Sequence, residues 1–162
     1  MIDQIELLKL IEKNSQLTSA EIATQIGAAA ADVEKEIADL KAQNIILGAT
    51  TQINWDETTL DRVTAMIEVR ITPVREKGFD KLADILCEYE NVTACYLMSG
   101  GFDLMLIYEG KNLRDIASFV YDKVATQEGV LSTATHFILR KYKDNGILFK
   151  TKDSDDRQAI VL

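Results

Sequence analysis

Residues 92–106 have the sequence VTACYLMSGGFDLML, which is the strongest indication of fold in the second half of the chain. Mostly apolar residues from Val92 to Met98 and from Phe102 to Tyr108 indicate two strands. The residues between them, Ser99-Gly100-Gly101, predict a tight turn, because glycine adopts backbone conformations that other residues avoid. The stretch therefore predicts a β-hairpin.

Two helices and two further strands are predicted on either side of this hairpin. Val63–Ile71 alternates apolar with mostly polar residues, as a strand with one covered face does, and Pro73 ends it because proline lacks an N–H for the ladder. The apolar spacing of the remaining segments predicts helices at 79–86 and 113–124 and a long strand at 130–142. The resulting order is β-α-β-β-α-β, the split βαβ or ferredoxin-like arrangement.

The first third of the chain is predicted to be a helix-turn-helix module. Apolar residues at three- and four-residue steps indicate three helices, the first with its stripe at 2–11, then 20–26 and 30–43. Thr18 or Ser19 can cap the second helix, with Glu21 placed as in a capping box. Gly27 suits the left-handed residue at which helices often end.

Two short apolar segments after the third helix predict a wing. Ile45–Leu47 and Ala49–Ile53 are expected to pair as strands that turn at Gly48, and the polar stretch that follows is the best candidate for a linker. The predicted fold is thus α+β, divided into a winged helix-turn-helix domain at 1–54, a linker at 55–61, a βαββαβ domain at 62–143 and a C-terminal extension at 144–162.

The composition indicates a globular, cytoplasmic protein. Hydrophobic residues make up 47% and charged residues 27% of the chain, and no stretch approaches the ~20 apolar residues of a membrane span. The acidic, amphipathic N-terminus is unlike a signal peptide. Cys87 and Cys95 are expected as free, buried thiols rather than a disulfide, and His136, the one histidine, leaves too few ligands for zinc. No metal, cofactor or phosphate-binding glycine loop is expected.

The charge distribution opposes nucleic-acid binding by the N-terminal module. Residues 1–60 hold four lysines, no arginine and ten acidic residues, which gives 4 − 10 = −6 of the net charge of −8. Clustered basic residues normally supply the attraction to DNA phosphates. Any DNA binding by this module must therefore overcome an unfavourable charge.

Several stretches resemble the Lrp/AsnC (feast/famine) family of transcription regulators, and the resemblance covers nearly the whole chain. LLKLIEKNSQLTSAEIATQIG (7–27) is similar to the family's first two helices, and LKAQNIILGATTQIN (40–54) to its passage from third helix to wing. VTACYLMSGGFDLML is similar to the family's most characteristic strand-turn-strand motif. KDSDDRQAIVL (152–162) is similar to the C-terminal sequence of a subset of its members. The resemblance implies homodimers that assemble into tetramers or octamers, with double-stranded DNA and an amino acid or related metabolite as partners.

The resemblance also implies an effector site near the glycine turn. Its candidate residues are Met98, Ser99, Gly100, Gly101 and Asp103, with Ser132, Thr133 and Thr135 supplied by a neighbouring subunit. Uncovered N–H groups of the turn can bind a carboxylate, and the carboxylate of Asp103 can take an α-amino group. A simple hairpin also explains the glycines, and threonine is a common strand residue.

For DNA, the candidate residues lie on the third helix and are Ala30, Ala31, Lys35 and Lys41. Reading a guanine edge needs arginine or lysine, and Lys35 is the single candidate, with Asp32, Glu36 and Asp39 beside it. Ala29 offers no capping side chain, whereas small alanines can contact thymine methyl groups.

These observations predict a DNA-binding transcription regulator that responds to an amino acid or similar metabolite. One alternative is a ligand-responsive oligomer that has lost DNA binding. A second is an enzyme similar to the sirohaem decarboxylases, which share this two-part architecture, but a single histidine and no basic cluster argue against it. His136 is interpreted as a structural or interface residue, and no catalytic residue is predicted.

Overall fold

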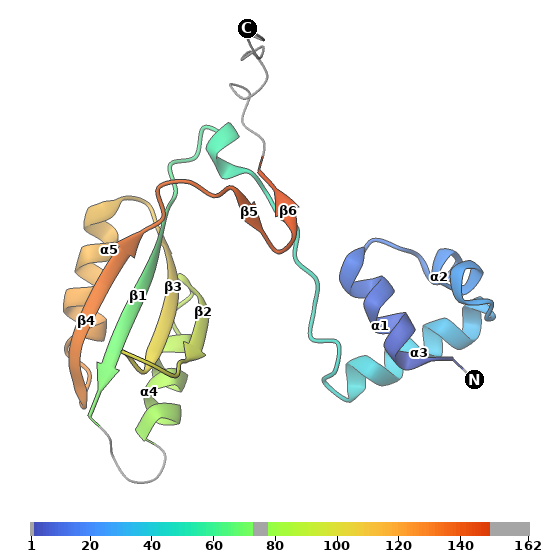
Figure 1. The fold of residues 1–162 in the computed structure, drawn as a ribbon, viewed down its shortest axis with the longest axis horizontal. Coiled ribbons are helices and arrows are strands. Elements are labelled where there is room, and N and C mark those ends of the chain that lie inside the picture. Colours follow the sequence, from blue (N-terminus) through green and yellow to red (C-terminus); the bar gives the residue numbers. More distant parts are fainter. Residues whose placement is uncertain (1, 73–77, 150–162) are drawn as a thin grey trace, which may run out of the picture. The chain divides into compact units, whose positions relative to one another are not determined.

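The computed structural model describes residues 2–72 and 78–149. The chain divides into two compact units, Met1–Gln52 and Ile53–Leu162 (Figure 1). Each unit has its own cluster of buried apolar side chains. The whole stretch expected as a linker, residues 55–61, belongs to the second unit. Trp55–Glu57 forms a short 3-10 turn, η1, and the Arg62 guanidinium lies 5.0 Å from the centre of the Trp55 ring.

The first unit consists of the three predicted helices, α1 (Gln4–Lys13), α2 (Ser19–Ile26) and α3 (Ala30–Ala42). Leu7, Ile22, Val33 and Leu40 are its most buried side chains. Among the described residues, no helix is both long and apolar enough to cross a membrane.

The predicted capping box at the start of α2 is confirmed. The Thr18 hydroxyl accepts from the Glu21 N–H at 3.3 Å, and the Glu21 carboxylate accepts from the Thr18 N–H at 2.8 Å. These hydrogen bonds to the Thr18 backbone and hydroxyl stabilise the charged form of Glu21 and lower its pKa. At the other end of α2, Gly27 is left-handed with φ of +65°, as predicted. The helix-turn-helix geometry is thus fixed at both ends of α2.

The predicted wing is wrong, because the described residues 45–53 contain no strand. The reason lies at the end of α3, where Asn44 is left-handed with φ of +57°. The N–H groups of Ile45 and Ile46 both donate to the Leu40 carbonyl, at 2.9 and 3.3 Å. These donors are therefore used to terminate the helix rather than to pair strands.

The second unit has the predicted βαββαβ order, formed by β1 (Val63–Ile71), α4 (Gly78–Cys87), β2 (Val92–Leu97), β3 (Leu104–Gly110), α5 (Leu113–Phe119) and β4 (Val130–Phe137). The four strands form one antiparallel sheet in the order β2-β3-β1-β4 (Figure 1). This is the ferredoxin-like arrangement, so the predicted fold class is confirmed.

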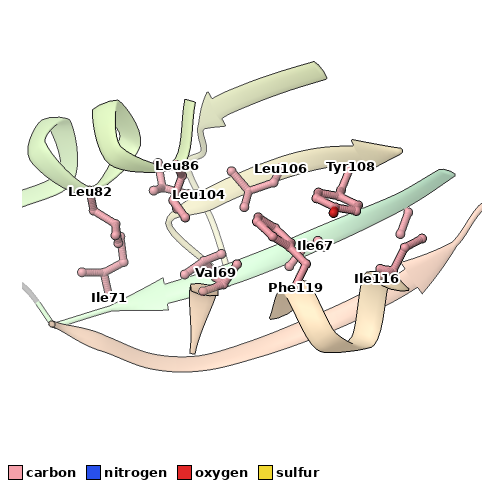
Figure 2. Packing of buried hydrophobic residues seen from close by; sticks show 12 residues of the cluster. Ile67, Val69, Ile71, Leu82, Leu86, Leu104, Leu106, Tyr108, Ile116 and Phe119 are labelled. Carbon is pink, nitrogen blue, oxygen red and sulfur yellow. The ribbon is translucent and has the colours of Figure 1, made fainter. Parts of the chain in front are cut away.

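Both helices cover the same face of the sheet. The alternate residues of β1 that face them are fully or almost fully buried, and they pack with Leu82 and Leu86 of α4 and with Ile116 and Phe119 of α5 (Figure 2). The Phe119 ring stacks on Tyr108 with 4.1 Å between ring centres. Each such buried side chain contributes about 1.5–3 kcal/mol to stability. In the described part of this unit, no helix packs on the opposite face of the sheet.

Three predicted boundaries differ from the structure. The last strand ends at Phe137 rather than at residue 142, and it is followed by a hairpin of β5 (Lys143–Asp144) and β6 (Ile147–Leu148). The helix at 113–124 changes at Val120 into a π-helical turn, η2 (Val120–Val124). Strand β3 begins at Leu104 rather than at Phe102. Pro73 and the stretch 152–162 lie outside the described residues.

Candidate functional site

The connection between β2 and β3 is a six-residue loop, Met98–Asp103, rather than the predicted tight turn. It is closed by the Met98 N–H, which donates to the Asp103 carbonyl at 2.8 Å. Gly100 has φ of +141°, a conformation that favours glycine, whereas Gly101 does not have a positive φ. A Cβ at either glycine would meet no atom within 4 Å. Among the described residues, neither a positive φ nor a close contact therefore explains the glycine at position 101.

Asp103 has a structural role that the sequence did not reveal. Its carboxylate Oδ2 accepts from the N–H of Ile71 at 2.7 Å, and its own N–H donates to the Val69 carbonyl at 3.0 Å. The Val69 carbonyl faces β3, so the N–H of Ile71, two residues further along β1, faces the same side, where the Asp103 carboxylate supplies its acceptor beyond the start of β3. This contact leaves Oδ1 for a second donor.

The three hydroxyl residues of β4 do not share one face of the sheet. Thr133 and Thr135 pair with Val69 and Ile67, which face the helices, whereas Ser132 pairs with Arg70 on the other face. Strand β1 also separates β4 from β3 and from the Met98–Asp103 loop. A single chain therefore does not bring the two parts of the predicted effector site together.

The uncovered face of the sheet is mixed in character. Its side chains, placed by the strand register, include Met66, Glu68, Tyr96, Met105, Ile107 and His136. The His136 Nε2 lies 3.1 Å from Glu68 Oε1, and the Tyr96 side chain remains 54% exposed. Histidine 136 is thus paired with a carboxylate on a strand face.

The candidate DNA-contact residues of helix α3 differ in their exposure to solvent. Ala31, Lys35 and Lys41 are exposed, whereas Ala30 packs partly against the core of the first unit. The helix begins after Ala29 with no side-chain cap, as predicted. Among the four predicted residues, the two lysines are therefore the ones that offer charge to a phosphate or base edge.

Lys35 lies in an acidic groove of about 620 Å³ between the starts of α1 and α3. Five carboxylate residues line the same groove: Asp3, Glu6, Asp32, Glu36 and Asp39. Glu36 accepts a hydrogen bond from Gln4 Nε2 at 2.6 Å, which ties α1 to α3. Lys35 forms no ion pair in the part of the chain that the structure describes. The unfavourable charge predicted from composition is thus concentrated beside the one lysine suited to reading a base.

Known proteins resemble both the sequence and the fold. Residues 64–148 match the Lrp/AsnC ligand binding domain. The chain is 38% identical over 159 residues to the uncharacterized HTH-type transcriptional regulator YugG of Bacillus subtilis, covering 98% of this chain and 95% of the relative. It is 28% identical over 145 residues to the HTH-type transcriptional regulator LrpA of Pyrococcus horikoshii, covering 88% and 100%. A transcriptional regulator from Neisseria meningitidis in complex with L-Met has a similar fold, with a TM-score of 0.70 and 19% identity over 89% of this chain and 94% of that one.

Proposed function

Since this chain belongs to the Lrp/AsnC family of HTH-type transcriptional regulators, we propose that it binds double-stranded DNA as an oligomer and that an α-amino acid modulates this binding. The relatives are transcriptional regulators, not enzymes, which argues against the decarboxylase alternative. The helix-turn-helix of α2, Gly27 and α3 is the element through which the first unit contacts DNA.

The Met98–Asp103 loop carries the effector part of the proposal. Gly101 has open space around it and does not have a positive φ, and we take the room that it leaves for a bound molecule as the reason for the glycine. Loop N–H groups bind the α-carboxylate, and Asp103 Oδ1 accepts from the α-ammonium group while Oδ2 stays on Ile71. The L-Met complex of the Neisseria relative supports an amino acid as the class of effector.

The uncovered sheet face is the surface through which we expect two chains to pair. Replacing Tyr96 by glutamate puts a charge on that face in both subunits, because a two-fold interface repeats every change. Light scattering of the variant at micromolar concentration is expected to show a shift from dimer or larger assembly towards monomer. Tyr121→Glu is the matched control, since Tyr121 is exposed on η2, away from that face. A wild-type protein that is monomeric at micromolar concentration would refute the oligomer.

A mobility-shift assay on the DNA upstream of the protein's own gene tests the DNA part. Lys35→Ala is expected to reduce specific binding by roughly 10-fold or more, because one good base contact contributes about 1–3 kcal/mol of discrimination. Lys123→Ala, on η2 of the second unit, is the control and is expected to leave binding unchanged. The DNA affinity of each first unit is expected to fall only weakly with rising salt concentration. The slope reflects the number of phosphates that the protein neutralises, and the first unit has few cations.

The acidic groove favours a second candidate function, a ligand-responsive oligomer that no longer binds DNA. The same assay separates the two. If the full-length protein ignores its upstream DNA at low salt with amino acids present, this second function replaces the first.

A further inference from the structure

The two cysteines of the chain come from different elements but lie side by side in the fold. Cys87 is the last residue of α4, and Cys95 lies in β2. Cys95 pairs with Leu106, a fully buried residue of the helix-covered face, so its side chain points towards the layer that contains α4. Helix α4 packs against β2, and the Cys87 thiol is near enough to Cys95 to raise the pKa of Cys95. The packing of α4 on β2 therefore brings the two cysteines near each other.

The two thiols differ in environment. Cys95 is partly buried and packs against the core, whereas Cys87, at the end of α4, is exposed, so the expected burial is wrong for Cys87. Burial, together with the neighbouring Cys87, raises the pKa of Cys95 to about 11. Cys95 therefore stays protonated at neutral pH, and Cys87 is the thiol that a dissolved oxidant can reach.

We propose that Cys87 and Cys95 form a reversible redox site, which a hydroperoxide converts into an intramolecular disulfide. The Cys87 thiolate attacks the peroxide, its new S–O bond forms as the O–O bond breaks, and an alcohol or water leaves, which gives a sulfenic acid. The Cys95 sulfur then attacks the Cys87 sulfur, and the S–O bond breaks. The hydroxyl group leaves as water with the Cys95 thiol proton. The two thiols are oxidised by two electrons, the peroxide is reduced, and a dithiol reductant reverses the reaction.

This site lies at the base of the Met98–Asp103 loop but does not depend on the effector that the loop binds. Cys95 is two residues before the end of β2, the strand that runs into the loop. The disulfide would tie this strand to the C-terminal end of α4. The oxidation can therefore be measured without any effector or DNA.

The test treats the full-length protein with hydrogen peroxide, blocks remaining thiols with N-ethylmaleimide and measures the intact mass. The wild type is expected to lose two hydrogens, to take up no maleimide, and to regain two reactive thiols after dithiothreitol. Peptide mapping is expected to link residue 87 to residue 95. Because the chain has two cysteines, no other intramolecular disulfide is possible.

Cys87→Ser and Cys95→Ser are the matched variants, each checked for folding by circular dichroism. Cys95→Ser is expected to accumulate a Cys87 sulfenic acid that dimedone traps, whereas Cys87→Ser reacts much more slowly. The proposal is overturned if peroxide-treated wild type still takes up two maleimides. It is equally overturned if the disulfide forms only between chains, or if Cys87 passes to sulfinic acid without any disulfide.

Discussion

Replacing Asp103 by alanine is expected to weaken amino-acid binding by roughly 10- to 150-fold, because a hydrogen bond to a charged group contributes about 1.5–3 kcal/mol. The same change is expected to lower the free energy of unfolding by about 1–3 kcal/mol, since the buried N–H of Ile71 loses its acceptor. Calorimetry with a panel of amino acids and thermal unfolding measure the two effects separately.

Asp103→Asn is the control that separates binding from stability. The asparagine side chain keeps an oxygen that accepts from the Ile71 N–H, so the unfolding free energy should stay near that of the wild type. It lacks the negative charge that an α-ammonium group requires, so the effector affinity should fall as in the alanine variant. An asparagine variant that binds the wild-type ligand with unchanged affinity would remove Asp103 from the effector site.

Separating the first unit from the second is expected to weaken specific DNA binding by about 10²–10⁴-fold, because linked modules bind a second half-site at high effective concentration. Residues 1–52 retain a complete buried cluster, so the isolated unit should remain helical by circular dichroism. Its few cations and the acidic groove beside Lys35 leave each copy weak when it binds alone.

A fusion of residues 1–52 to an unrelated coiled-coil dimer is the matching control. The fusion is expected to recover much of the lost affinity if bivalence is the cause, and little if the second unit contacts DNA itself. Equal affinity of the isolated unit and the full chain would show that bivalence is not needed.

Most of the fold could be predicted from the sequence because apolar spacing and local signals agree there. Thr18, Glu21 and Gly27 mark the ends of α2 through backbone chemistry that involves only nearby residues. The wing failed because Ile45 and Leu47 have the apolar character of strand residues but no paired strand. Instead, the first N–H groups of this segment donate to the Leu40 carbonyl and terminate α3. The β5–β6 hairpin has a local sequence signal, Asn145-Gly146. Both residues have a positive φ, as tight hairpin turns require.

The candidate sites were less predictable, because their geometry depends on contacts between distant segments. The contact between Asp103 and Ile71 joins residues 32 positions apart, and no sequence pattern marks it. The division of Ser132 and Thr133 between the two faces follows from alternation along β4 and was open to prediction. The proximity of Cys87 to Cys95 could not be predicted from the sequence, because it depends on the packing of α4 against β2.

The position of β1 at the centre of the sheet also sets the order in which the chain can acquire its structure during synthesis. Its neighbours β3 and β4 both follow it in the sequence, and Ala65 pairs with Phe137. The buried cluster of the first unit, in contrast, is complete by Leu40. N-terminal domains generally fold first as a chain emerges from the ribosome, and pairing between distant strands is slow. The helix-turn-helix unit can therefore form on nascent chains that still lack β4, whereas the proposed pairing of subunits through the sheet requires chains whose synthesis has passed Phe137.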